Sequence, residues 1–171
     1  MKKLFVLTLI AGLFTTLTSS AQDDKSKRVS PPATAKETLA SGAAVTIDYS
    51  QPSVKGRKIG ADIAPYGKVW RTGANEATVF ETSKDVKVDG KALAAGKYGL
   101  YTIPGEKEWT IIFNKTWKQW GTDYKEADDA LRVAVKPGKA ASASEKMTFK
   151  DEKSGKGSLL WGDVVVPFTV K

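Results

Sequence analysis

Two residue types are missing from this 171-residue chain, which contains no cysteine and no histidine. Without cysteine the chain has no disulfide, no thiol nucleophile and no cysteine to carry a lipid anchor. Without histidine it has no Ser-His-Asp triad, no Cys-His pair, no histidine-based zinc site and no histidine proton shuttle. Any catalysis must therefore use carboxylates, lysine, tyrosine or a metal held by oxygen atoms.

Long apolar runs are also scarce, and the only one is close to the start of the chain. Leu4 to Leu17 follows Lys2 and Lys3 and precedes the small residues Ser19-Ser20-Ala21, an order typical of a secretory signal. At about 1.5 Å per residue this run is shorter than a hydrocarbon core of about 30 Å. We therefore predict a cleaved signal peptide at residues 1–21. The mature chain is expected to have no transmembrane segment and to be exported, to the periplasm or the extracellular space.

Acidic residues are outnumbered by basic ones, 19 against 27, so the net charge is +8. Loss of Lys2 and Lys3 with the signal peptide leaves 25 basic residues and a net charge of +6. This excess favours anionic partners such as acidic polysaccharides or lipid head groups, or else serves solubility. Nucleic acid is an unlikely partner, because the lysines are scattered and there is no basic helix or RNA-binding signature.

Helical periodicity is absent, and short alternating segments dominate the rest of the chain. Residues 22–35, with Pro31-Pro32, are expected to form a flexible tether to a domain at 36–171. Asp89-Gly90, within residues 86–93, predicts a tight hairpin. Residues 115–130 predict a loop with a helical turn near its end, and the alanine-rich residues 137–144 a link. The other predicted strands are 43–50, 77–83, 96–104, 108–114, 131–135, 147–150 and 159–170, with a short one at 69–71. The pattern indicates one all-β domain, a β-sandwich with Greek-key or jelly-roll order.

The most unusual segment is the glycine-punctuated stretch 56–76, which also carries arginines, a tryptophan, an asparagine and carboxylates. Neither a plain helix nor a plain strand has this composition, so we expect an irregular loop rich in hydrogen-bonding groups. It overlaps residues 65–77, which end in the motif VWRTGANEA at 69–77.

With this motif, and with the segments 47–57, 93–105, 108–112, 119–121 and 131–133, the chain resembles domain-of-unknown-function family 2911. The resemblance covers about residues 30–171. It implies an exported, β-rich protein of unassigned activity, and it brings no catalytic or binding residues with it. The segment 136–144 departs from the family's pattern by its alanine-rich composition.

We interpret the loop as a candidate ligand site. Arg71 can clamp a carboxylate or phosphate with its planar fork, and Asn75 and Glu76 can orient hydroxyl groups. The predicted site residues are Arg57, Tyr66, Trp70, Arg71, Asn75 and Glu76. The leading hypothesis is a non-catalytic binding or interaction module in the envelope for an anionic or glycan ligand. In the competing interpretation Arg71 pairs internally with Glu76 or Asp48 and pins the loop to the sheet.

Two other classes of function remain open. A hydrolase that uses paired carboxylates, such as a glycosidase, could draw on Asp48, Asp62, Glu76 or Asp123, although their spacing selects no pair. A purely structural protein is the lesser alternative.

Two further side-chain groups have competing interpretations. An aromatic platform for a sugar could form from Trp117, Trp120 and Tyr124, or one of these tryptophans could cap the end of the core. The acids between Asp123 and Asp129 fit no calcium loop, so we predict no metal and no cofactor.

Overall fold

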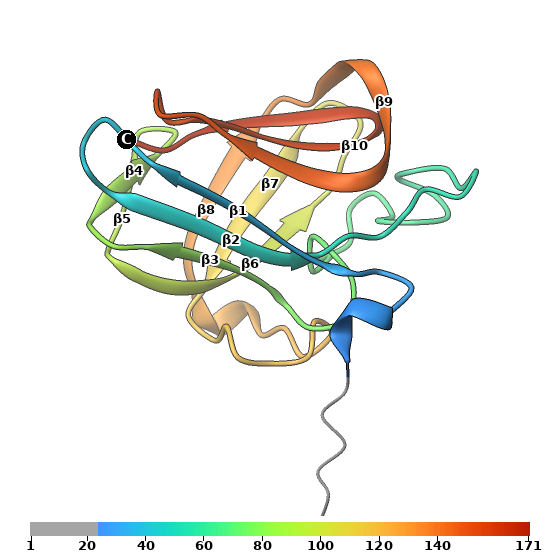
Figure 1. The fold of residues 1–171 in the computed structure, drawn as a ribbon, viewed down its shortest axis with the longest axis horizontal. Coiled ribbons are helices and arrows are strands. Elements are labelled where there is room, and N and C mark those ends of the chain that lie inside the picture. The colour runs from blue at the N-terminus through green and yellow to red at the C-terminus, as the bar shows by residue number, and fades with distance from the viewer. Residues whose placement is uncertain (1–23) are drawn as a thin grey trace, which may run out of the picture.

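Strands make up almost all the regular structure of the protein (Figure 1). The structure is a computed structural model that describes residues 24–171, so the predicted signal peptide at 1–21 lies outside the described residues. In chain order the elements are η1 (Lys25–Lys27), β1 (Pro32–Thr38), β2 (Ala44–Ser50), β3 (Thr78–Thr82), β4 (Val86–Val88), β5 (Lys91–Leu93), β6 (Gly96–Ile103), β7 (Trp109–Asn114), η2 (Glu126–Asp128), β8 (Asp129–Val135), β9 (Gly138–Asp151) and β10 (Lys156–Thr169). The predicted all-β class is confirmed.

Six strands form one antiparallel sheet in the order β1-β2-β3-β6-β7-β8. Each strand pairs with its neighbour along the chain, except that the small hairpin β4–β5 is inserted between β3 and β6. This sequential order is a meander and differs from the Greek-key or jelly-roll order that we expected. Short turns join β1 to β2 and β6 to β7, where consecutive antiparallel strands pair readily, whereas the long segment 51–77 joins β2 to β3.

The second layer is the long hairpin of β9 and β10, which lies across one face of the sheet (Figure 1, orange and red). Phe149 of β9 meets Tyr49 of β2 with ring centroids 5.0 Å apart, and the Phe149 amide donates to the Tyr49 hydroxyl at 3.1 Å. In the sheet, Phe80 and Phe113 pack edge to face at 5.0 Å. Burial of each such side chain contributes about 1.5–3 kcal/mol, so this interface is the main source of stability.

The alternating patterns predicted most of these strands correctly. At the β4–β5 turn, Asp89 and Gly90 both have positive φ, 44° and 84°, as a two-residue hairpin turn requires. The β6–β7 hairpin and the helical turn η2 are also present. At 69–71 only an isolated bridge forms, in which Trp70 and Thr102 exchange backbone hydrogen bonds of 2.8 and 2.9 Å.

Two segments differ from expectation. Residues 138–144, which we predicted to be a link, form the first half of β9 and pair with β10, for example Lys139 with Val164. Residues 32–35, assigned to the tether, begin β1 and pair with β2. Backbone ladder bonds need no apolar side chain, so an alanine- and serine-rich segment pairs when a long partner strand lies beside it. Pro32 is tolerated because it starts an edge strand.

Candidate functional site

Residues 51–77 connect β2 to β3 as a long irregular loop (Figure 1, teal to green). Loops of this length without regular structure are uncommon in compact domains and usually carry function. Residues from the start, middle and end of the loop border a hollow of about 520 Å³, which we call the arginine pocket. Arg57, Trp70 and Arg71 line it, so the structure brings three of the six predicted site residues together.

Arg71 is the central side chain of this pocket. Its Nε is buried without a hydrogen-bond partner, and among residues 24–171 Arg71 makes no hydrogen bond and no ion pair. The two terminal Nη atoms are not among the buried unpaired atoms, so they reach solvent in the hollow. The aliphatic stem packs on Gly121 so closely that a Cβ there would overlap Arg71 Cδ. The expected internal pair of Arg71 with Glu76 or Asp48 is therefore wrong, since Arg71 is positioned by packing alone.

Two further cations line the pocket, Lys55 and Arg57. Arg57 donates from Nε to the Val54 carbonyl at 3.1 Å and from Nη2 to the Ser53 carbonyl at 2.6 Å. These bonds fix the guanidinium without neutralising it, because a carbonyl carries no net charge. No Asp or Glu is part of the pocket's lining, so its local field is positive.

Apart from Ser30, Ser53 and Gly73, aromatic and aliphatic side chains form the rest of the wall. The rings of Trp70 and Trp161 stack at 5.0 Å with an interplanar angle of 9°, and Trp109 meets Trp70 edge on at 6.4 Å. Trp161 is 3% exposed and its Nε1 is buried without a partner. A register shift in β10 lies at this residue, between Leu160 and Gly162. Such irregularities re-aim side chains and are frequent beside functional sites.

The backbone that presents Arg71 is strained. Thr72 has φ of 51°, an unusual value for a β-branched residue, and its side chain is almost fully buried. The Thr72 hydroxyl bonds Thr102 Oγ1 at 3.1 Å, and the Thr78 hydroxyl donates to the Thr72 carbonyl at 2.8 Å. Strain of this kind costs about 1–3 kcal/mol and persists where surrounding contacts enforce it, often at functional sites.

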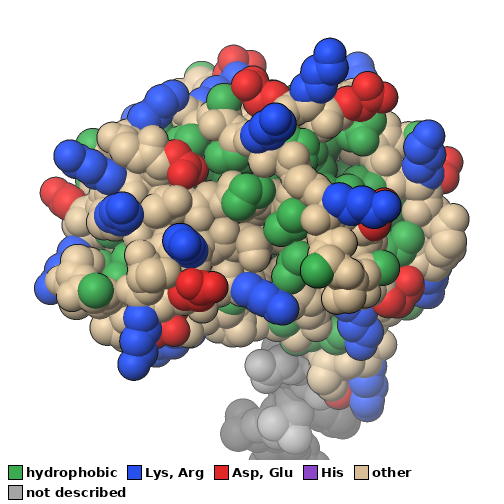
Figure 2. All heavy atoms as spheres, turned by 90° about the horizontal axis from the view of Figure 1, so that it is seen from above, with side chains coloured by type: hydrophobic (Ala, Val, Ile, Leu, Met, Phe, Trp, Pro, Cys, Tyr) green, Lys and Arg blue, Asp and Glu red, His purple; other side chains and the backbone are tan. Residues whose placement is uncertain are grey.

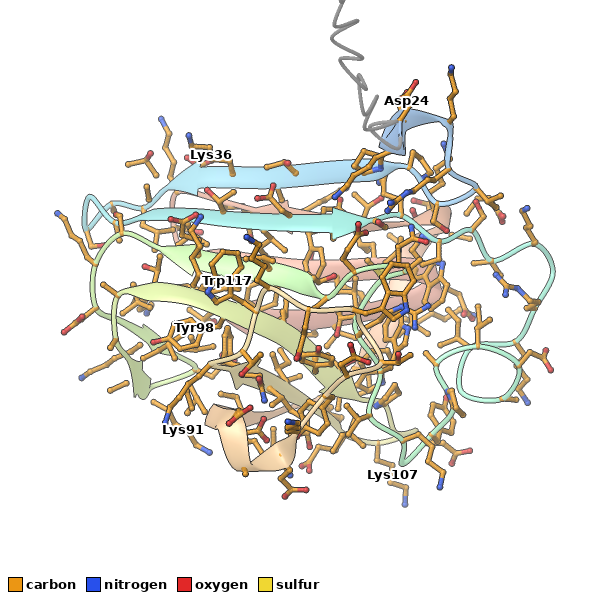
Figure 3. All side chains as sticks on the ribbon, turned by 90° about the horizontal axis from the view of Figure 1, so that it is seen from below. Asp24, Lys36, Lys91, Tyr98, Lys107 and Trp117 are labelled. Carbon is orange, nitrogen blue, oxygen red and sulfur yellow. The ribbon has the colours of Figure 1, made fainter. Side chains whose placement is uncertain are left out.

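Asn75 and Glu76 lie outside the lining of the arginine pocket and hold an N-terminal arm, defined here as residues 25–31. Glu76 pairs with Lys25 at 3.1 Å and with Arg28 at 2.7 Å. Asn75 Nδ2 donates to the Ser30 carbonyl at 3.4 Å. Figure 3 shows Asp24 at the start of this segment, beside the first residues of β1. The arm contributes Ser30 and Val29 to the pocket wall. Because Asn75 and Glu76 hold the arm, these two predicted site residues shape the pocket indirectly.

The pKa of Glu76 agrees with this role. Partial burial acts to raise it, but hydrogen bonds from its own amide, from Arg28 and from Lys25 prevail and lower it to about 2. Glu76 is thus ionised at all physiological pH values and unsuited to donate a proton. Tyr66, the sixth predicted residue, packs against Gly60 and lines a different hollow with Glu106 and Trp109.

The carboxylates considered for a hydrolase do not form an acid–base pair. Asp48 and Glu76 line a second hollow of about 280 Å³ together with Lys25, but the pKa of Glu76 is lowered. Asp62 bonds the Lys58 amide at 2.8 Å, and Asp123 is exposed. The acid whose pKa is raised, to about 6 by burial and by the charge of Glu37, is Asp151 at the end of β9. Asp151 is not part of either lining.

The predicted aromatic platform is divided by other contacts. Trp117, labelled in Figure 3, lies beneath the ammonium of Lys97 at 5.2 Å, while Trp120 is 49% exposed. Tyr124 is committed to a network, since its hydroxyl donates to Asp129 Oδ2 at 2.7 Å and accepts from Arg132 at 2.8 Å. Within residues 24–171 no group of three acidic side chains is arranged to hold a metal ion.

Sequence reasoning missed three contributors to the pocket: Lys55, Trp161 and the arm residues. Lys55 lies in segment 47–57, which carries part of the family resemblance. Its place in that segment, two residues before Arg57, could have marked it as a candidate site residue. Trp161 is 90 positions beyond Arg71 along the chain, and no local pattern connects them. Only the packing of β10 against the loop brings them together.

Of three comparisons with known proteins, one found a match. In the described part of the chain, neither short helix has the length or apolar character needed to cross a membrane. Comparisons with curated proteins and with solved structures found no match. A family model, described as "Protein of unknown function (DUF2911)", matches residues 30–170 and so spans all ten strands. The chain therefore belongs to the DUF2911 family of proteins of unknown function.

Proposed function

We propose that this protein is an exported, non-catalytic binding module that takes an anionic ligand in the arginine pocket. The observation that carries the proposal is Arg71, whose guanidinium has no partner within residues 24–171 and whose Nη atoms open into the hollow. Guanidinium groups that are part of a fold's own architecture are usually paired, because an unsatisfied polar group costs about 1–3 kcal/mol. An anion supplies the missing acceptor.

Two features of the pocket support this proposal. Its volume of about 520 Å³ lies in the range of about 300–1,000 Å³ that small-molecule sites occupy. The charges of Lys55 and Arg57 add to that of Arg71, with no acid in the lining to oppose them. A ligand with one or two negative charges would therefore be attracted to this wall.

The face of the protein seen from above does not carry a continuous basic patch. Figure 2 shows basic and acidic side chains interspersed over the face seen from above. A mixed surface of this kind favours solubility, whereas an extended nucleic-acid site requires a continuous basic stripe. The contrast between this mixed surface and the basic pocket supports a small ligand bound in the pocket.

Export is part of the proposal and rests on the residues at the start of the chain. The pattern of Lys2 and Lys3, an apolar run and Ser19-Ser20-Ala21 supports it. The hydrolase alternative has less support, since Glu76 is ion-paired and Asp151 lies outside both hollows.

Calorimetric titration of the purified protein with sodium sulfate and sodium glucuronate tests the proposal. Saturable binding is expected, and Arg71→Met should weaken it about ten- to a hundredfold, the effect of one or two hydrogen bonds to a charged group. Lys36→Met is the matched control, because it removes one positive charge at the far end of β1 from the arm (Figure 3). Equal affinities for the wild type and Arg71→Met, or no binding of any anion, would reject the proposal.

A further inference from the structure

The charged groups of the arginine pocket are all hydrogen-bond donors. Lys55, Arg57 and Arg71 can only donate hydrogen bonds, and the lining contains no carboxylate. The carbonyls of Ser53 and Val54 already accept from Arg57, and the carbonyl of Ser30 accepts from Asn75. The charged part of the wall is therefore matched to a group that only accepts, and the hydroxyls of Ser30 and Ser53 in the lining can donate to such a group as well.

Two lining residues of the pocket also carry buried, unpaired donors. Arg71 Nε and Trp161 Nε1 are both buried N–H groups without acceptors, and both residues line this hollow. Neither group can accept a hydrogen bond. A ligand O–H placed beside these N–H groups would face other donors. It would lose its hydrogen bond to water without gaining an acceptor, and leaving a buried donor unsatisfied costs binding free energy.

We propose that the ligand carries a fully deprotonated oxyanion, a carboxylate or a sulfate group, and that the pocket discriminates against a phosphate group that retains a proton. This inference rests on the proposed anion-binding function and names the ligand class. A carboxylate matches the planar end of the Arg71 guanidinium with two parallel hydrogen bonds, and a sulfate presents the same pair of oxygens.

The body of the ligand is organic and of about monosaccharide size. A hollow of about 520 Å³ is larger than a lone inorganic anion needs. Its remaining wall is mostly apolar, and the stacked indoles of Trp70 and Trp161 make it rigid. The apolar residues are Val29, Pro52, Ile63, Ala64, Trp70, Ala74 and Trp161.

Four sugars that differ only in the group at carbon 6 test the inference. They are glucuronate, glucose 6-sulfate, glucose 6-phosphate and glucose. Each is titrated into the purified protein at about pH 8 and about pH 5, with calorimetry or tryptophan fluorescence as the readout. A phosphate monoester has its second pKa near 6, so about a tenth of it remains doubly deprotonated at about pH 5. Its affinity should fall about tenfold over this range, while glucuronate and the sulfate change by less than about twofold.

The protein itself contributes little pH dependence at this site. The chain has no histidine, and the charged groups of the lining are arginines and a lysine. Around the pocket, Glu145 accepts from the Lys55 amide, and burial raises the pKa of Tyr101, which the charge of Arg71 partly offsets. Asp151, with a pKa of about 6, lies outside the lining, and glucose 6-sulfate controls for any indirect effect it has.

The outcomes separate the two proposals. If no derivative binds, or if Arg71→Met binds glucuronate as tightly as the wild type, the anion-binding function itself fails. If binding depends on Arg71 but glucose 6-phosphate binds equally well at both pH values, only the ligand class is wrong. Preference for glucuronate over the sulfate, or the reverse, identifies the group. Binding of glucose as tight as that of glucuronate overturns the inference and leaves a neutral-sugar site.

Discussion

Two arginines of this chain, Arg132 and Arg71, differ in whether their guanidinium groups have partners within the fold. Arg132, on β8, donates from Nε to Asp129 at 2.7 Å and from Nη2 to the Tyr124 hydroxyl at 2.8 Å, and it pairs with Glu126 at 3.1 Å. Arg71 has no hydrogen bond or ion pair among residues 24–171. Both stand in segments that combine aromatic and acidic residues, and the local sequence does not distinguish them.

The electrostatics of the two sites differ in the same way. The hydrogen bond to Asp129 raises the pKa of Arg132, and burial together with Asp129 raises the pKa of Tyr124 to about 12. The guanidinium of Arg132 is thus used within the fold. That of Arg71 lies beside a hollow with two more cations and no acid in its lining. This comparison supports our proposal that Arg71 binds a ligand, whereas the contacts of Arg132 are made within the fold.

The largest expected effect is the difference between Arg132→Met and Arg71→Met in the free energy of unfolding. Arg132→Met leaves Asp129, whose side chain is 10% exposed, without its cation, and should destabilise the protein by about 2–3 kcal/mol. Arg71→Met should not destabilise the protein, because it breaks no internal polar contact and removes a buried, unpaired N–H group. Urea denaturation measures both, and a larger loss for Arg71→Met would reverse the assignment of roles.

Next in size is Gly121→Ala, which displaces Arg71 without removing its charge. The new Cβ would overlap Arg71 Cδ and lie 2.8 Å from the Asn75 carbonyl oxygen. Overpacking of this kind costs about 1–3 kcal/mol, and sulfate binding should weaken along with it. Gly138→Ala is the control, since its Cβ would meet only Val165 Cγ1 at 3.3 Å. Unchanged sulfate affinity in Gly121→Ala would mean that the position of Arg71 is unimportant.

A pH-dependent gain in stability is expected for Asp151→Asn. The pKa of Asp151 in the folded protein, about 6, is above its ordinary value of 3.8. The folded state therefore holds the proton longer than the unfolded state, and wild-type stability falls as pH rises from about 4 to about 6. After allowance for partial exposure, Asp151→Asn should gain about 1–2 kcal/mol at about pH 8 and almost nothing at about pH 3.5. Denaturation curves at both pH values test this, and an equal gain at both would exclude the titration of Asp151 as the cause.

The smallest effect concerns Glu76→Gln, which removes the ion pairs of the arm. Because the pKa of Glu76 is lowered from 4.5 to about 2, its contribution to stability is present above pH 4.5 and is lost as pH falls toward 2. Such exposed pairs contribute less than about 1 kcal/mol. Trypsin should cleave after Lys25, Lys27 and Arg28 faster in this variant, with little change in the unfolding midpoint. An unchanged cleavage rate would show that Glu76 does not hold the arm.

Alternation of apolar and polar residues was enough to predict most of the strands. Val45, Ile47 and Tyr49 occupy one face of β2 and are all buried, as their spacing requires. The Asp89-Gly90 turn was predictable because few residue pairs tolerate positive φ at two successive positions. Residues 138–144 were not predictable, since their pairing depends on β10 rather than on their own side chains.

The candidate site was predictable in part. Arg57, Trp70 and Arg71 line one pocket, whereas Tyr66 faces another hollow and Glu76 holds the arm. Proximity along the loop suggested a single cluster, but side chains on an irregular loop point in several directions. Thr72 and Asn75, both with positive φ, turn the chain between Arg71 and Glu76.

The sequence by itself determined the all-β class, the hairpins and the exclusion of cysteine and histidine chemistry, because these follow from composition and from spacing over a few residues. Only the tertiary structure decided which charges are neutralised within the fold. Glu76 meets Lys25 and Arg28, Arg132 meets Asp129, and Arg71 lies beside Trp161 and a hollow. The physical reason is that ion pairing depends on distances of a few ångströms between segments far apart in the chain, and strand packing sets those distances.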